Sequence, residues 1–214
     1  MTKQEKKECF LEAMQFRHAC KLFDETKKIP QEDIDFILEV ARLSPSSFGM
    51  EGWKFLVITN QELKEKLRPF CWNQPQITTC SHLVVILAAI NNLKPQNGVV
   101  KKQLARRKLT QEQLDGYVQK YTSHLQPILE DDKKLFTWSA RQTYIAAANM
   151  MQAAATIEID SCPIEGFEKE NVEKVLELDT KEYQVALLLP FGYRVNPQPK
   201  KLRYKKEEIT TFFD

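Results

Sequence analysis

The amino-acid sequence predicts an α+β fold, and three observations carry that prediction. Residues 31–43 repeat apolar side chains at helical spacing, and a longer helical stretch occupies residues 135–157. Two runs rich in strand-forming residues, 54–59 and 82–90, lie between these helices, and a third, 183–193, follows them. With 214 residues the chain can bury a substantial core, so it is expected to form one domain.

The first of these helices is defined by an apolar stripe at positions i, i+3, i+4 and i+7. The stripe consists of Ile34, Ile37, Leu38 and Ala41. Pro45 ends this helix, because the residue before a proline avoids the helical conformation. The strand at 54–59 precedes a short helix at 61–67. Residues 82–90 form a continuous apolar run between polar segments, which predicts a central strand buried on both faces.

Residues 96–133 are strongly polar and are expected to form a partly exposed helical excursion of the single domain 1–214. Its few apolar anchors are Leu104, Leu114, Tyr117, Val118 and Tyr121. The helix at 135–157 is apolar nearly all round from Tyr144 onward, which predicts that it is buried. Its six alanines would let another helix approach closely, and packing within the chain and a dimer seam explain them about equally well.

The last strand, 183–193, is interrupted by Pro190, so an edge position or a bulge is expected there. Residues 196–199 read as a stiff extended connector into a C-terminal arm, 196–214. The arm carries Phe212 and Phe213, which are expected to be buried against another surface, with a partner subunit as one candidate.

Composition excludes several classes of protein. The chain is 43% hydrophobic and 28% charged with a net charge of +2, so no strong field favours nucleic acid or an anionic membrane. The polar N-terminus leads into no apolar signal segment, and the longest apolar run, 83–90, is too short to span a bilayer. Five scattered cysteines then predict reduced thiols in a cytoplasmic protein.

Three short segments stand out along this chain. Residues 17–21 read Arg-His-Ala-Cys-Lys, residues 44–49 read Ser-Pro-Ser-Ser-Phe-Gly, and residues 163–167 read Pro-Ile-Glu-Gly-Phe. Taken singly, the two cations of the first segment are better explained as solvated, and the second as an ordinary loop after a helix. Together, in this order, the three resemble the flavin-binding segments of the oxygen-insensitive nitroreductase family. The resemblance extends over about 16–209 and is weakest in the excursion.

This resemblance implies a mixed, mainly antiparallel sheet flanked by helices, in an intertwined homodimer with two FMN sites at the subunit interface. It implies that Arg17 of the segment Arg17-His18-Ala19 binds the FMN phosphate, completed by Lys201 and Arg203. Lys200, Lys205 and Lys206 lie close by and leave the register of this last pair open. Ala19 stands where the family often has serine, so one phosphate hydrogen bond is expected to be missing.

The flavin ring is implied to meet a second group of residues. Lys21 reaches the pyrimidine edge, where negative charge develops on reduction, and Asn73 recognises the same edge through its amide. Gln76 stands where the family frequently has a second lysine, so a weaker positive field is expected. The backbone of Glu165 and Gly166, after Pro163 and Ile164, lies against the atom that accepts hydride, which makes Lys21 and Glu165 the candidate catalytic residues.

The loop is implied to act across the dimer, where Pro45, Ser46 and Ser47 contact the FMN of the opposite subunit. Gly49 replaces a common asparagine, so a contact to the ribityl chain is in doubt. Glu158 likewise replaces a glycine that ends the long helix, so this helix is expected to end differently.

The resemblance implies a reductase that takes electrons from NAD(P)H and passes two to a nitroaromatic or quinone by a ping-pong mechanism. No glycine-rich nucleotide motif occurs, so the nicotinamide must share the flavin face, and no cue separates NADH from NADPH. A flavin carrier or sensor without turnover is the alternative. The basic run 101–108 could contact nucleic acid but better fits a solvated helix face. Cys71, Cys80 and His82 lack a standard zinc spacing, so no metal is expected.

Overall fold

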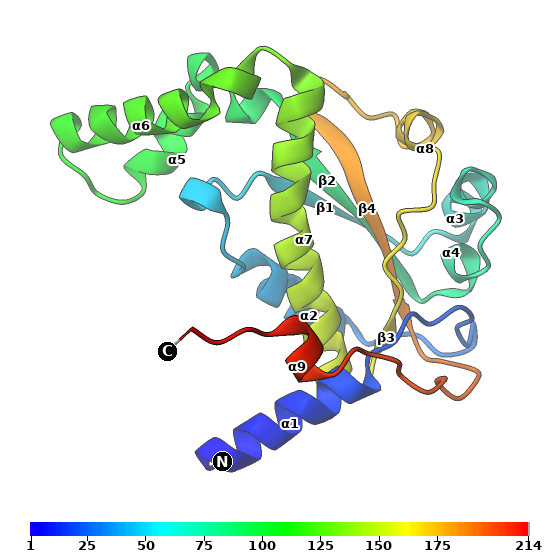
Figure 1. The fold of residues 1–214 in the computed structure, drawn as a ribbon. Helices are drawn as coiled ribbons and strands as arrows, with labels where there is room; N and C mark the ends of the chain where they lie inside the picture. The colour runs from blue at the N-terminus through cyan, green and yellow to red at the C-terminus, as the bar shows by residue number, and fades with distance from the viewer. Residues whose placement is uncertain (214) are drawn as a thin grey trace.

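A four-stranded antiparallel sheet lies at the centre of the computed structural model, which describes residues 1–213. Its order is β1-β2-β4-β3, and every neighbouring pair is antiparallel. The strands are β1 (Trp53–Ile58), β2 (His82–Ala89), β3 (Asp160–Ser161) and β4 (Tyr183–Gly192). The long helix α7 (Asp132–Thr156) runs along one face of the sheet (Figure 1). The predicted α+β class and the mainly antiparallel sheet are therefore confirmed.

Strand β2 separates two apolar cores. Val84 and Ile86 point into a core completed by α2 (Gln31–Arg42) and α7. Leu83 and Val85, on the opposite face, pack with residues of α3 (Gln61–Leu67) and α8 (Lys169–Val175). All residues of β2 are buried. The unbroken apolar run of this strand follows from coverage on both faces, as predicted.

The remaining helices lie at the margins of this body. Helix α1 (Lys3–Phe16) begins with a capping box between Thr2 and Glu5 and extends away from the sheet (Figure 1). The short helices are α4 (Gln76–Thr79) and α9 (Lys206–Ile209), with single 3₁₀ turns η1 (Ser47–Gly49), η2 (Arg68–Cys71), η3 (Asn91–Leu93) and η4 (Pro95–Asn97). No helix within residues 1–213 is both long and apolar enough to cross a bilayer.

Helices α5 (Val99–Ala105) and α6 (Gln111–Leu129) form the excursion, which projects from one end of the sheet (Figure 1). They share a small core of their own. Of the predicted anchors, Leu104, Leu114 and Tyr121 are buried in it, and the Tyr121 hydroxyl donates to the carbonyl of Leu93 at 2.7 Å. The prediction for Tyr117 was wrong, because its ring is exposed. Leu125 and Leu129 complete this core instead.

Helix α7 is not buried all round after Tyr144, contrary to the prediction. Ala146 and Met150 face the core, whereas Tyr144 and Ile145 are exposed, because the sheet and α2 cover only one side of the helix. The prediction that the helix ends differently because it lacks a terminal glycine was also wrong. Glu158 itself adopts the left-handed conformation, with φ of 59°.

Pro190 causes neither of the features predicted for it. Strand β4 lies inside the sheet, and Pro190 pairs in continuous register with Leu83. Its carbonyl accepts the N–H of Cys162 at 3.2 Å, so its ring nitrogen faces the side of the short strand β3, where few partners are required. The irregularity lies at Ala186, which is skipped between the pairs Ile86–Leu187 and Leu87–Val185. In the single chain, Phe212 and Phe213 of the arm are exposed.

Candidate functional site

The end of helix α1 meets the segment that follows β3. Arg17 caps the helix with extended backbone, and Ala19 forms a parallel bridge with Ser161. The N–H of Cys20 donates to the carbonyl of Ser161 at 3.1 Å. The Lys21 Nζ atom lies 3.5 Å from the Cys162 Sγ atom. The first sequence segment therefore lies beside the two residues that directly precede the third.

Cations from both ends of the chain gather at this point. The Lys201 ammonium donates to the carbonyls of Arg17 and Met14, which holds the C-terminal arm against the end of α1. Burial and then the nearby Arg203 lower the pKa of Arg17. Burial, followed by Arg17 and Arg203, lowers the pKa of Lys201. An anion bound among these groups would relieve their repulsion.

A buried carboxylate beside this cluster is already paired with a different arginine. Asp160 is buried and forms a salt bridge of 2.7 Å with the Arg194 guanidinium. Arg194 also donates to the carbonyl of Phe16 at 3.3 Å and lies over the Phe16 ring. His18 faces the same pair, 3.5 Å from Asp160, and its pKa is lowered by burial and then by Arg194. The His18 ring therefore packs beside the Asp160–Arg194 ion pair and adds no positive charge to the cations.

A chain of side-chain contacts leads from Lys21 to the third segment. The amide of Gln76, which is 1% exposed, donates to Gln74 Oε1 at 2.9 Å and lies 3.8 Å from the Cys162 Sγ atom. Gln74 in turn donates to the carbonyl of Gly166 at 2.9 Å. Burial raises the pKa of Cys162 despite the adjacent Lys21. Cys162 therefore remains a neutral thiol that holds Lys21 in place.

An indole ring lies directly against Gly166. A Cβ atom at this position would come within 2.6 Å of two ring carbons of Trp72. Trp72 and Asn73 both have positive φ, 55° and 53°, and both side chains are exposed. This bend presents Asn73 at the surface beside the 163–167 segment. The buried Ile164, directly after Pro163, anchors that segment through a bridge to Leu188.

The loop after α2 and the 163–167 segment lie on opposite sides of helix α7. The N–H of Ser47 donates to Gln142 Oε1 at 2.9 Å, whereas the hydroxyl of Tyr144 donates to the carboxylate of Glu165. Each residue advances an α-helix by about 100°, so residues two apart face nearly opposite ways. A single chain therefore keeps Pro45, Ser46, Ser47 and Gly49 away from the cations and from the 163–167 segment (Figure 1).

Within this loop the predicted ligands have internal partners. The Ser46 hydroxyl accepts the N–H of Glu51 at 2.8 Å, and the carbonyl of Gly49 accepts Gln103 at 3.1 Å. Ser44 accepts the Asn149 amide of α7 at 2.9 Å. Hydrogen bonds within the loop and to neighbouring elements therefore define its conformation.

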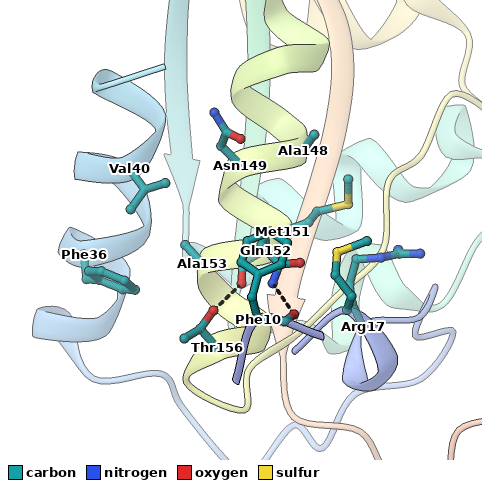
Figure 2. Close-up of a pocket in the computed structure, with 11 residues that line it drawn as sticks. Phe10, Arg17, Phe36, Val40, Ala148, Asn149, Met151, Gln152, Ala153 and Thr156 are labelled. Carbon is teal, nitrogen blue, oxygen red and sulfur yellow. Dashed lines mark hydrogen bonds between the residues drawn. The ribbon is translucent and has the colours of Figure 1, made fainter. Parts of the chain in front are cut away.

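A groove of about 500 Å³ lies between helices α1, α2 and α7, and Figure 2 shows its lining. Phe10, Phe36 and Val40 make it apolar, and Arg17 stands at one end. The Gln152 amide donates to the carbonyl of Phe10 at 3.4 Å, which ties α1 to α7 (Figure 2). The groove opens onto the surface rather than onto the sheet.

Sequence reasoning missed Cys162, Gln74, Trp72 and Arg194, which connect the predicted residues. Cys162 directly precedes a recognised segment, and Trp72 and Gln74 flank Asn73, so their positions offered a weak signal. Arg194 offered none, because its partner Asp160 lies on another strand.

Comparisons with known proteins identify the family and the fold of this chain. Residues 14–193 match the family model described as Nitroreductase family. A Bacillus subtilis (strain 168) protein named "Putative NAD(P)H nitroreductase YfkO" is 44% identical over 210 residues, which cover 93% of this chain and 95% of that protein. A crystal structure of a nitroreductase-like protein from Streptococcus mutans has a TM-score of 0.82 at 21% identity, covers 97% of this chain and 100% of that one, and shows the fold alone. Another, a "putative nitroreductase in complex with FMN" from Exiguobacterium sibiricum 255-15, has a TM-score of 0.77 at 25% identity and covers 95% and 97% of the two chains.

Proposed function

We propose, from the premise that the chain belongs to the nitroreductase family, that it is an FMN-dependent oxidoreductase with NAD(P)H as the electron donor. The observation that carries the proposal is the meeting of Arg17, Lys201 and Arg203 beside Lys21 and the 163–167 segment. The FMN in the related Exiguobacterium sibiricum structure supports the identity of the cofactor.

The positive charges of Arg17, Lys201 and Arg203 complement the negative charge of the FMN phosphate. Among residues 1–213, no carboxylate forms an ion pair with Arg17, Lys201 or Arg203, and Asp160 is held by Arg194. Hydrogen bonds from charged donors contribute about 1.5–3 kcal/mol each, so a phosphate dianion would stabilise this arrangement. The arm that carries Lys201 would then be fixed by the cofactor as well as by the carbonyls of Met14 and Arg17.

FMN supplies the redox chemistry when bound, and the chain supplies position and charge. Lys21 would supply one positive charge to the pyrimidine edge of the flavin, and its Nζ atom contacts the Cys162 Sγ atom at 3.5 Å. Gln76 supplies no charge there, because its amide is buried and directed to Gln74. The backbone of Glu165 and Gly166 would lie near the flavin atom that accepts hydride, and the Tyr144 hydroxyl donates to the Glu165 carboxylate.

A homodimer would complete the site. The loop that contains Ser46 and Ser47 faces away from the cations of its own chain, so a second copy must bring its loop to them. Large apolar side chains that suit such an interface are exposed on α1 and on the C-terminal arm. They are Phe10, Leu11, Met14, Leu202, Tyr204, Phe212 and Phe213. The apolar groove along α7 adds to this surface (Figure 2).

The acceptor in this proposal is a nitroaromatic or a quinone, reduced by two electrons. The chain has no glycine-rich nucleotide motif, so donor and acceptor would occupy the same face in turn, which gives ping-pong kinetics. A flavin carrier or sensor without turnover is the second candidate. The uncharged, buried Gln76 favours it, because the field that stabilises reduced flavin is weaker.

The test is the visible spectrum of the purified protein, followed by separate addition of NADH and NADPH without oxygen. A flavin spectrum that bleaches with one donor and returns with a nitroaromatic or quinone supports the reductase and identifies the donor. A bound flavin that neither donor bleaches supports the carrier or sensor. A protein that binds no FMN refutes the assignment.

A further inference from the structure

The loop between α2 and β1 has an unusual backbone. Phe48, Gly49 and Glu51 adopt positive φ values of 55°, 61° and 49°. Residues other than glycine seldom adopt this conformation, and those that do cluster at ligand sites, where surrounding contacts hold them. Phe48 and Glu51 therefore need support from elsewhere in the fold.

That support comes from the end of helix α5 and the turn that follows it. Gln103 donates to the carbonyl of Gly49 at 3.1 Å, and Arg107 donates to the carbonyl of Phe48 at 2.6 Å. Arg106 forms an ion pair with Glu51. Each residue with positive φ is thus met by one side chain of the excursion.

Aromatic contacts orient the same two parts. The Phe48 ring meets Tyr121 of α6 edge-on, with ring centroids 5.3 Å apart. The Arg107 guanidinium lies over the ring of Tyr117, 5.3 Å from its centroid. This contact helps to orient the guanidinium that donates to the loop. Tyr117, which is exposed and lies outside the core, thus contacts an arginine that binds the loop.

We propose that Gln103, Arg106 and Arg107 are positioning residues that hold the 46–51 loop in the shape required for FMN binding across the dimer. This inference rests on the proposed function, in which the loop contacts the cofactor of the second subunit. It gives the excursion a role in cofactor binding. It also assigns two exposed arginines of the basic run, 101–108, to contacts within the chain rather than to a nucleic-acid surface.

The test compares Arg107→Gln and Arg107→Lys with the control Lys102→Gln in the full-length holoprotein. Lys102 lies on helix α5, five residues before Arg107, is exposed, and forms no side-chain hydrogen bond or ion pair with residues 1–213, so its variant removes the same charge without touching the loop. FMN release after dilution, followed by flavin fluorescence, should be about fivefold faster for Arg107→Gln. Arg107→Lys should restore most of the difference because an ammonium still donates to one carbonyl.

Hydrogen exchange of the protein without FMN separates this inference from the proposed function. The amides of Gly49, Met50 and Glu51 donate within the loop, so their exchange reports its opening. They should exchange faster in Arg107→Gln and not in Lys102→Gln. If FMN release and exchange are both unchanged in Arg107→Gln, the inference is overturned. If wild-type protein binds no FMN, the proposed function fails, and with it the cofactor role, even where exchange shows that Arg107 holds the loop.

Discussion

Gly192 and Gly166 each lie against an aromatic ring at the place where a Cβ atom would stand. Substitution by alanine is nevertheless expected to cost much stability at Gly192 and little at Gly166. A Cβ atom at Gly192 would lie 2.8 Å from the Phe23 ring and 3.2 Å from the Phe23 Cβ atom. Phe23 is 1% exposed, and its N–H donates to Thr79, so neither ring nor backbone can retreat. Gly192→Ala therefore overpacks the core.

Overpacking of this kind costs about 1–3 kcal/mol. In a chain of this size, each kcal/mol of lost stability lowers the melting temperature by about 2–4 °C, so Gly192→Ala should lower it by roughly 2–12 °C. Gly166→Ala brings a Cβ atom even closer to a ring, 2.6 Å from Trp72. Trp72 is 69% exposed, however, and its ring can turn into solvent. Gly166→Ala should leave the melting temperature within about 2 °C.

Thermal unfolding of both variants, monitored by circular dichroism in FMN-free protein, is the assay. The reasoning predicts a large shift for Gly192→Ala and a small one for Gly166→Ala, with the Gly166 variant altered instead in the fluorescence of Trp72. Equal shifts, or a larger shift for Gly166→Ala, would show that burial of the opposing ring does not decide the cost.

Other predictions concern charge. Arg17→Ala should weaken FMN binding about tenfold or more in fluorescence titration, because it removes a charged phosphate donor, and unchanged affinity would exclude Arg17 from the site. Lys21→Ala should slow hydride acceptance and lower the flavin midpoint potential, measured by stopped-flow absorbance and by redox titration; if both stay unchanged, the electrostatic role of Lys21 is wrong. Burial is the main cause that lowers the pKa of both His18 and His82 from the ordinary 6.5, so the unfolded chain binds more protons and stability should fall as pH drops below about 6.5. Replacing both histidines by glutamine should flatten this dependence in melting curves, and an unchanged slope would contradict it.

Much of the fold follows from local pattern in the sequence. The α2 stripe, the short helix α3 and the buried run of β2 all lie where periodicity placed them, because each element buries the face that its pattern marks. The errors share one cause. The exposure of Tyr144 and the placement of Pro190 inside the sheet depend on what covers each element, and a local window contains no information about that neighbour.

The candidate site divides in the same way. Residues in short recognisable segments, such as Arg17 and Gly166, could be named from the sequence because their order and types resemble a family. The Gln74 and Cys162 contacts that join those segments could not, since they arise only when β3, the end of α1 and the bend at Trp72 meet. The hydrogen bond from Arg107 to the carbonyl of Phe48 could not be predicted for another reason. Charged residues on a polar helix usually indicate a solvated face.

The opposite directions of Gln142 and Tyr144 on helix α7 have a genetic consequence. In the proposed dimer each chain would give its cations to one cofactor and its serine loop to the other. A variant damaged only in the cations and a variant damaged only in the loop would each be defective at both sites when alone. In a mixed dimer, one site would carry both lesions and the other would carry none. Two inactive alleles expressed together would then restore about half of the activity of wild-type dimers in each mixed dimer, which is intragenic complementation between the two faces of a single helix.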